Sequence, residues 1–228
     1  WHLQLAILWI ALSWMGTAIY LAPLVAGREP AGQRAMVNIL FVAAVAVAVG
    51  SLLGAVLGIT GYLGEAWVWL GHQGSEYLDL GRFWQVLLAI GLVLWLVLML
   101  RALAPALKDR TRREFTALFM IASAAIVVFY LPPFFWGART NFAIIDNWRF
   151  WIIHLWVEGF FELFVTVMVA VLLFKLGMIS RQTATRVIYL DAILFLGSGI
   201  IGTGHHWYWT GQSNINLALA ACFSRNRE

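Results

Sequence analysis

The sequence predicts an all-α integral membrane protein, a bundle of six transmembrane helices followed by a short terminal segment. Of its 228 residues, 62% are hydrophobic and only 11% are charged. A soluble domain cannot bury that much apolar surface, so lipid is expected to be the main solvent. The apolar residues also gather in runs of about 20, the length of helix that crosses a hydrocarbon core of about 30 Å.

Six apolar runs are long enough to cross a membrane. They are residues 3–26, 35–58, 84–107, 114–135, 150–175 and 184–206. A seventh run, Ile215 to Phe223, is too short to cross. The chain begins at Trp1, directly at the first run and without a preceding basic segment or start methionine, so we expect it to be a piece of a longer protein. The single cysteine, Cys222, excludes an internal disulfide and a cysteine-based metal site.

Basic residues distribute unevenly among the connections between these runs. The first, third and fifth connections hold ten Lys and Arg residues, whereas the second and fourth hold three. Because cytoplasmic loops carry the excess of basic residues, the odd-numbered connections are predicted to be cytoplasmic and the even ones to face outward. This bias also explains the net charge of +4, so no nucleic-acid partner is expected.

Two features of the predicted outer side stay ambiguous from the residues alone. His2 opens the first run, where an interfacial histidine is favoured over a ligand. Glu76 and Asp79 lie three residues apart in the second connection, so they could share a helical turn and hold a hard cation. Two carboxylates are few for such a site, and a solvated loop face is the favoured interpretation.

The stretch from Asn147 to Leu163 carries the strongest functional signal. His154, Glu158 and Glu162 recur at intervals of four among apolar residues. On an α-helix their side chains therefore line one face. Ionisable groups inside a bilayer are costly and are by default a functional hypothesis, so this row predicts a built site.

Two further histidines are expected at the same membrane level. His205 and His206 end the sixth run, which crosses in the opposite direction to the fifth. Adjacent side chains on a regular helix point about 100° apart, so both can reach one ion only if the helix is distorted. Gly202 and Gly204 just before them permit such a distortion.

Histidines and a carboxylate together predict a transition-metal site. Imidazoles suit iron, copper or zinc, and a carboxylate one turn from a histidine can complete the coordination sphere. His154, His205, His206 and Glu158 are the composition expected of a non-haem iron site, because the carboxylate favours iron over copper. The alternative is a set of unrelated interfacial histidines and a buried acid pair.

Three segments resemble the nitric oxide reductases of the haem-copper oxidase superfamily. HLWVEGFFE at 154–162 and GTGHHWYW at 202–209 are similar to the paired signatures of these enzymes, and GHQGSEYLDLGRFWQ at 71–85 is most similar to their single-subunit, quinol-dependent branch. The oxygen-reducing relatives have His-Pro-Glu-Val-Tyr where this chain has HLWVE at 154–158. Glu158 thus stands in place of the tyrosine, which argues against an oxygen reductase.

The resemblance implies roles for the residues of the predicted metal site. His154, His205 and His206 would bind the non-haem iron FeB. Glu158 would be its carboxylate ligand, and Glu162 would lie beside these ligands, where it tunes charge and proton supply.

The resemblance also implies a haem site and a calcium site. His2 would be an axial ligand of the low-spin haem b, which reverses the interpretation favoured by its position alone. Glu76 would bind a calcium ion that bridges haem propionates, and Asp79 would be the nearby acid.

The function implied is reduction of two NO to N2O and water at a haem b3 and non-haem iron centre, with quinol supplying electrons through haem b. The chain would be the amino-terminal part of a twelve-helix catalytic core in a bacterial or archaeal cell membrane, with the metal site toward the outer side. Residues 1–223 would form a single membrane domain and residues 224–228 a divergent tail.

Two other interpretations stay open. The resemblance places the second haem b ligand and the haem b3 ligand on further helices, so the remaining half of the core is an expected partner and this chain alone is expected to be inactive. An NO dismutase of the same branch is one alternative. A truncated membrane fragment that no longer binds metal is the other.

Overall fold

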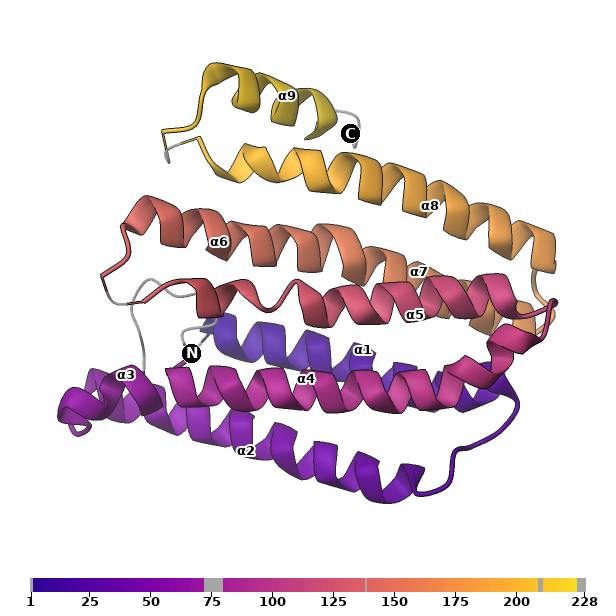
Figure 1. Cartoon of the computed structure of the whole chain (residues 1–228), viewed down its shortest axis with the longest axis horizontal. Coiled ribbons are helices and arrows are strands. Elements are labelled where there is room, and N and C mark those ends of the chain that lie inside the picture. The colour runs from indigo at the N-terminus through magenta and orange to yellow at the C-terminus, as the bar shows by residue number, and fades with distance from the viewer. Residues whose placement is uncertain (1, 72–79, 138, 209–210, 225–228) are drawn as a thin grey trace. The chain divides into compact units, whose positions relative to one another are not determined.

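The computed structural model describes residues 2–71, 80–137, 139–208 and 211–224 (Figure 1). All regular structure within these ranges is helical, with no strand. Contacts divide the chain into two compact units. The first comprises Trp1–Pro105 and Pro133–Ala138, and the second comprises Ala106–Pro132 and Arg139–Glu228. The single domain predicted over residues 1–223 stays a prediction.

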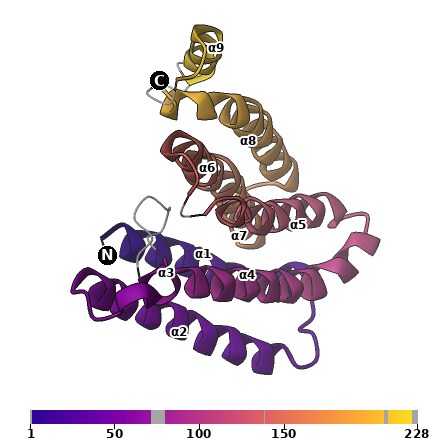
Figure 2. The same cartoon turned by 60° about the vertical axis from the view of Figure 1, so that its left-hand side comes forward.

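Three long helices form the first unit. They are α1 (His2–Ala26), α2 (Gln33–Ile59) and α4 (Arg82–Leu103). Both views show these helices side by side, with α3 (Trp67–Leu70) beyond the end of α2 (Figures 1 and 2). A short 3₁₀ turn, η1 (Gly64–Ala66), leads into α3.

The second unit is built around two long helical rods. One rod consists of α6 (Phe142–Leu155), the π-helical turn η5 (Trp156–Phe160) and α7 (Phe161–Lys175). The other consists of α8 (Arg181–Gly202) and the 3₁₀ turn η6 (Thr203–His206). The helix α5 (Arg113–Val128) packs on α7, and α9 (Asn214–Ser224) folds back on α8 (Figures 1 and 2).

Two further 3₁₀ turns connect these helices. The turn η3 (Ala104–Lys108) follows α4, and η4 (Pro132–Phe135) follows α5. The α-helical part of α5 ends at Val128, just before the Pro132 and Pro133 pair, because proline lacks the N–H that a continuing helix needs.

Six helical segments in the described residues are long and apolar enough to cross a membrane. They run Gln4–Ala26, Gln33–Ile59, Arg82–Lys108, Arg113–Phe135, Phe142–Lys175 and Arg181–His206. The prediction of six spans is therefore confirmed, as is the short terminal helix, which has 11 residues.

The fifth span begins earlier than the apolar run predicted. Its helix starts at Phe142 rather than near residue 150, and the Asn141 side chain caps it by accepting the Ala143 N–H at 2.9 Å. Arg149, assigned to the fourth connection from its charge, therefore lies inside α6. Hydropathy marks where apolar residues begin, whereas the cap marks where the helix begins.

Glycines in the left-handed conformation follow α2 and α7. Gly61 follows α2 with φ 79° and Gly177 follows α7 with φ 72°. After α7, the N–H groups of Gly177 and Met178 bond to the carbonyls of Phe174 and Leu173. This pattern satisfies the last carbonyls of the helix and reverses the chain, and it favours glycine because L side chains rarely adopt this φ.

Small residues of α2 allow close packing within the first unit. A Cβ at Gly50 would overlap the Trp84 ring, and a Cβ at Gly54 would overlap the Leu70 carbonyl. The Trp84 indole N–H donates to that carbonyl at 2.8 Å. Close approach of this kind is the main use of small residues between helices in lipid.

Two arginines of α4 donate hydrogen bonds to backbone carbonyls in loops of the first unit. Arg101 donates to the Ala31 carbonyl at 2.7 Å, and Arg82 donates to the Trp136 carbonyl at 2.8 Å. Both therefore have structural partners in addition to any role in topology.

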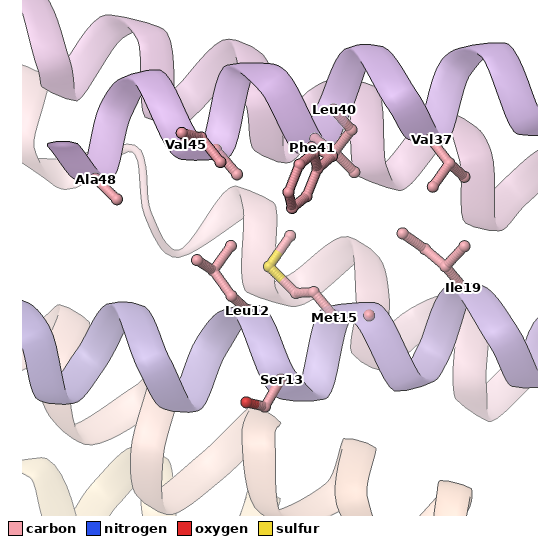
Figure 3. A pocket seen from close by; sticks show the side chains of 11 residues that line it. Leu12, Ser13, Met15, Ile19, Val37, Leu40, Phe41, Val45 and Ala48 are labelled. Atoms are coloured by element: carbon pink, nitrogen blue, oxygen red, sulfur yellow. The ribbon is translucent and has the colours of Figure 1, made fainter. Parts of the chain in front are cut away.

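An apolar groove of about 440 Å³ lies between α1 and α2. Leu12, Met15 and Ile19 reach from α1 toward side chains of α2 such as Phe41 (Figure 3). The lining contains no ionisable side chain, and its hydroxyl, on Ser13, donates to the Trp9 carbonyl of its own helix at 2.8 Å. The groove thus offers apolar contact and no group for chemistry.

Candidate metal centre

His154 is held in a defined orientation in the last turn of α6. Its side chain is 1% exposed, and its Nε2 lies 2.7 Å from the Gly199 carbonyl of α8. Because a carbonyl oxygen only accepts, Nε2 must carry the proton and donate it. The Nδ1 lone pair is then available on the other side of the ring, as in a histidine prepared to bind a metal.

Glu158 faces that lone pair one turn further along. Its Oε1 lies 3.4 Å from His154 Nδ1 and 3.6 Å from His206 Nε2. The interval of four predicted that Glu158 lies on a regular α-helix. In the structure it lies in the π-helical turn η5 instead. Such turns occur often at functional sites.

The π-helical turn is also tied to a neighbouring helix. The indole N–H of Trp156 donates to the Ile126 carbonyl of α5 at 2.9 Å, and the Trp156 ring stacks on Tyr130 with centroids 5.4 Å apart. These contacts fix the backbone that carries Glu158, although the sequence pattern does not reveal them.

His205 and His206 lie in η6, where α8 tightens from α-helix to 3₁₀-helix. Their ring centroids are 4.0 Å apart, and each ring lies about 5 Å from the ring of His154, at 4.9 and 5.1 Å. The change of helix type after Gly202 is the local distortion that two adjacent histidines need to face one site.

Gly204 is needed because it has no side chain, rather than because of its backbone freedom. A Cβ at Gly204 would lie 2.8 Å from the Cβ of Ala220 in α9. Gly204 is therefore required by the close approach of α9, which packs directly on the turn that carries the histidines.

Phe150 is a site residue that sequence reasoning missed. Its ring stacks on the imidazole of His206 with centroids 4.8 Å apart and an interplanar angle of 6°. Phe150 lies four residues before His154, so the i, i+4 row of the fifth span extends by one apolar position. That spacing was the available signal, but an aromatic residue among many in lipid does not stand out.

The four side chains fit a shared metal ion. One donor atom from each of His154, Glu158, His205 and His206 lies within 4.8 Å of the others, and His154 Nδ1 is 3.1 Å from His206 Nε2. Two ligand atoms each about 2.1 Å from one ion lie roughly 3.0 to 3.4 Å apart at bond angles of about 90 to 110°. Three nitrogens and one carboxylate oxygen suit iron.

The other predicted site residues are Glu162, His2, Glu76 and Asp79. Glu162 is half-buried in the first turn of α7 and is not one of the four clustered residues. His2 opens α1, in the first unit, and its haem role stays a prediction. Glu76 and Asp79 lie outside the described residues.

A buried acid in α8 was also missed. Asp191 is 9% exposed and lies beside the Thr166 hydroxyl of α7. A single acidic residue in a predicted span was the available signal.

We expect Gly204→Ala to displace η6 and to weaken metal binding at the candidate centre, because the added methyl group overlaps Ala220. The metal content of the purified protein measures this loss. Overpacking of this kind should also lower the stability of the protein by about 1–3 kcal/mol. Ala220→Gly should restore the metal in the double variant by removing the overlapping carbon. Equal metal loss in the single and double variants would contradict this steric account.

Comparison with known proteins identifies the family of the chain. Residues 1–225 match the family described as Cytochrome C and Quinol oxidase polypeptide I. The chain is also 27% identical over 233 aligned positions to a nitric oxide reductase subunit from Stutzerimonas stutzeri, in a match that covers 98% of this chain and 46% of that protein. The chain thus spans about half the length of the curated relative it matches.

The family match covers both helical units, including the stretches that contain His154 and the pair His205 and His206. The resemblance to the haem-copper oxidase superfamily that the motifs predicted is thereby confirmed. The chain therefore belongs to the Cytochrome C and Quinol oxidase polypeptide I family, whose members are multi-pass helical membrane proteins.

Proposed function

We propose that this chain is part of a respiratory oxidoreductase that reduces nitric oxide: two NO, two electrons and two protons become N2O and water. The observation that carries the proposal is the donor set of three histidines and Glu158, in which a carboxylate completes the group. Support comes from the relative named as a nitric oxide reductase subunit and from the family match.

His154, Glu158, His205 and His206 would hold the non-haem iron. Together with haem b3, this iron would supply electron transfer and Lewis-acid stabilisation of negative charge as the two nitrogens couple. The chain's own share is to place these side chains. The Gly199 carbonyl keeps His154 in the tautomer whose Nδ1 faces the site, and Phe150 holds the plane of His206.

Glu158 would serve two purposes in this proposal. Its carboxylate would balance the positive charge of the iron, with Oε1 3.4 and 3.6 Å from the ring nitrogens of His154 and His206. Its other oxygen can accept a proton destined for product water, which a neutral amide in the same place could not do. Glu162, one turn further along, would adjust the charge around the site and supply protons to it.

The electron donor and the remaining cofactors belong to the same proposal. Quinol would supply electrons through a low-spin haem b held in part by His2, and Glu76 would bind calcium near that haem. The odd-numbered connections would be cytoplasmic, because they carry most of the basic residues. That orientation would place the metal site toward the outer side of the cell membrane.

The reaction can be tested on membranes that contain the intact enzyme. We expect isotopically labelled NO to be converted to labelled N2O when a reduced quinol is supplied under anaerobic conditions, as measured by mass spectrometry of the gas phase. Labelled N2 together with O2 would identify a dismutase instead, and no gas product with quinol would overturn the proposed reaction. Reduced cytochrome c as an alternative donor tests the quinol assignment separately.

A parallel measurement addresses the interpretation as a degenerate fragment. We expect elemental analysis to find non-haem iron, and visible spectra to find haem, in the same preparation. An enzyme that has haem and no non-haem iron would contradict the role assigned to the four side chains.

A further inference from the structure

A second buried carboxylate lies in the membrane-spanning part of α8, away from the candidate metal centre. Asp191 is 9% exposed, and its Oδ2 is buried and accepts no hydrogen bond from a described residue. Its described polar neighbour is the Thr166 hydroxyl of α7. Acids in membrane spans are rare, and those that persist commonly belong to ion paths or proton relays.

Asp191 continues the row that contains the predicted site. Glu158, Glu162 and Thr166 recur at intervals of four along η5 and α7, so successive members lie about one helical turn apart. Thr166 is the last polar member of this row and meets Asp191 across the contact between α7 and α8. The row thus leads from the metal centre to a carboxylate on the other rod.

No cation neutralises Asp191 in the described part of the chain. The elements packed against α8 are α6, η5, α7, η6 and α9. Their titratable and charged groups, with those of α8 itself, are Asp146, Arg149, His154, Glu158, Glu162, Lys175, His205, His206, Cys222, Arg181, Arg186 and Tyr189. None of them forms an ion pair with Asp191.

The position of Asp191 along its helix suits a relay. It lies ten residues after the start of α8 and fourteen before His205, which is about 15 Å and about 21 Å of helix at 1.5 Å per residue. The near end of α8 follows the connection at residues 176–180, which the basic residues assign to the cytoplasm in the proposed topology.

We propose that Asp191 is a proton-relay residue that passes protons through the Thr166 hydroxyl to Glu162 and on toward Glu158. This inference rests on the proposed function, because reduction of NO consumes the protons delivered. In each transfer, the Thr166 oxygen accepts a proton from the Asp191 carboxyl and its own proton moves to the Glu162 carboxylate. Asp191 regains a proton from the side of residues 176–180, and no electron moves.

Side-chain rotation or a bridging water would complete the path from Thr166 to Glu162 and Glu158. Residues four apart on a helix have Cβ atoms about 5–6 Å apart, so their polar groups come within reach of each other or of one shared water. A hydroxyl and a carboxylate on one face are the groups between which a single water can bridge.

Two variants of the intact enzyme test the relay. We expect Asp191→Asn and Thr166→Val to slow proton uptake in a single turnover by about tenfold to 100-fold, while non-haem iron content and thermal stability stay unchanged. Asp191→Glu should restore uptake, because it returns a carboxyl group. The matched control is Thr116→Val, since the Thr116 hydroxyl is buried but donates to the carbonyl of Arg112, the N-cap residue of its own helix, at 2.9 Å.

Infrared spectroscopy supplies a readout that does not depend on NO. Reduced-minus-oxidised difference spectra should contain a carboxyl band that shifts in D2O, disappears in Asp191→Asn and persists in Thr116→Val. If the enzyme does not consume NO but shows this band, the proposed reaction fails and the relay assignment stands. If proton uptake and the band are both unchanged in Asp191→Asn, the relay is overturned. Should Asp191→Asn not accumulate, Thr166→Val decides: slowed proton uptake supports the relay, and unchanged uptake overturns it.

Discussion

Under the proposed function, replacement of His154 by Ala should remove the non-haem iron from the intact enzyme and abolish NO consumption. His154 directs Nδ1 at the other ligand atoms and is 1% exposed, so its truncation removes one of the four donor atoms from the buried side of the site. Removal of a residue that hydrogen-bonds to a metal ligand usually reduces metal affinity by about 10–100-fold. Removal of the ligand itself should reduce metal affinity by more than that. Elemental analysis measures the iron content, and an NO electrode measures the rate of NO consumption.

Ile152→Ala is the matched control for His154→Ala. Ile152 is 0% exposed in the same helix, and its truncation should cost about 2–5 kcal/mol of stability through the cavity it leaves. Iron should nevertheless remain bound in this variant. Full iron occupancy in His154→Ala, or equal iron loss in both variants, would show that His154 acts only through packing.

Replacement of Glu158 by Gln should reduce NO turnover by about 100-fold to 1,000-fold, in the range found when one electrostatic group at a reaction centre is removed. The substitution preserves size but removes the negative charge that faces His154 and His206. It also removes the oxygen that can accept a proton. We expect part of the iron to be lost, as measured by elemental analysis of the purified enzyme.

Glu162→Gln is the matched control for this charge change. Glu162 lies in the same row but outside the group of four donors, so its substitution should leave iron content intact and lower turnover less. Undiminished turnover with full iron in Glu158→Gln would refute the assignment of Glu158. If Glu162→Gln lost iron and Glu158→Gln did not, Glu162 would be the iron ligand and Glu158 the nearby acid.

The membrane architecture follows almost entirely from composition. Apolar runs of about 20 residues predict spans because lipid excludes unpaired backbone groups and therefore requires helices. The six spans agree with the prediction. The start of the fifth was misplaced because its first turns hold Asp146 and Arg149, whose charges resemble those of a loop, while the helix is set by the Asn141 cap.

The sequence also predicted which four residues form the candidate centre. Spacing brought His154 and Glu158 to one face, and the opposite direction of neighbouring spans brought His205 and His206 toward them. The sequence pattern could not reveal that Glu158 lies in a π-helical turn, since one extra residue in a turn leaves no mark on composition. It also could not reveal the stacking of Phe150 on His206, which depends on how α6 approaches η6.

The sequence by itself determined that this protein is a helical membrane protein with a histidine and carboxylate site, because periodicity and the exclusion of charge from lipid act locally along the chain. Only the tertiary structure decided which atoms face one another. The Gly199 carbonyl sets the tautomer of His154, Ala220 requires glycine at position 204, and Thr166 meets Asp191 across two helices. Each depends on packing between helices distant in sequence, which no local pattern encodes.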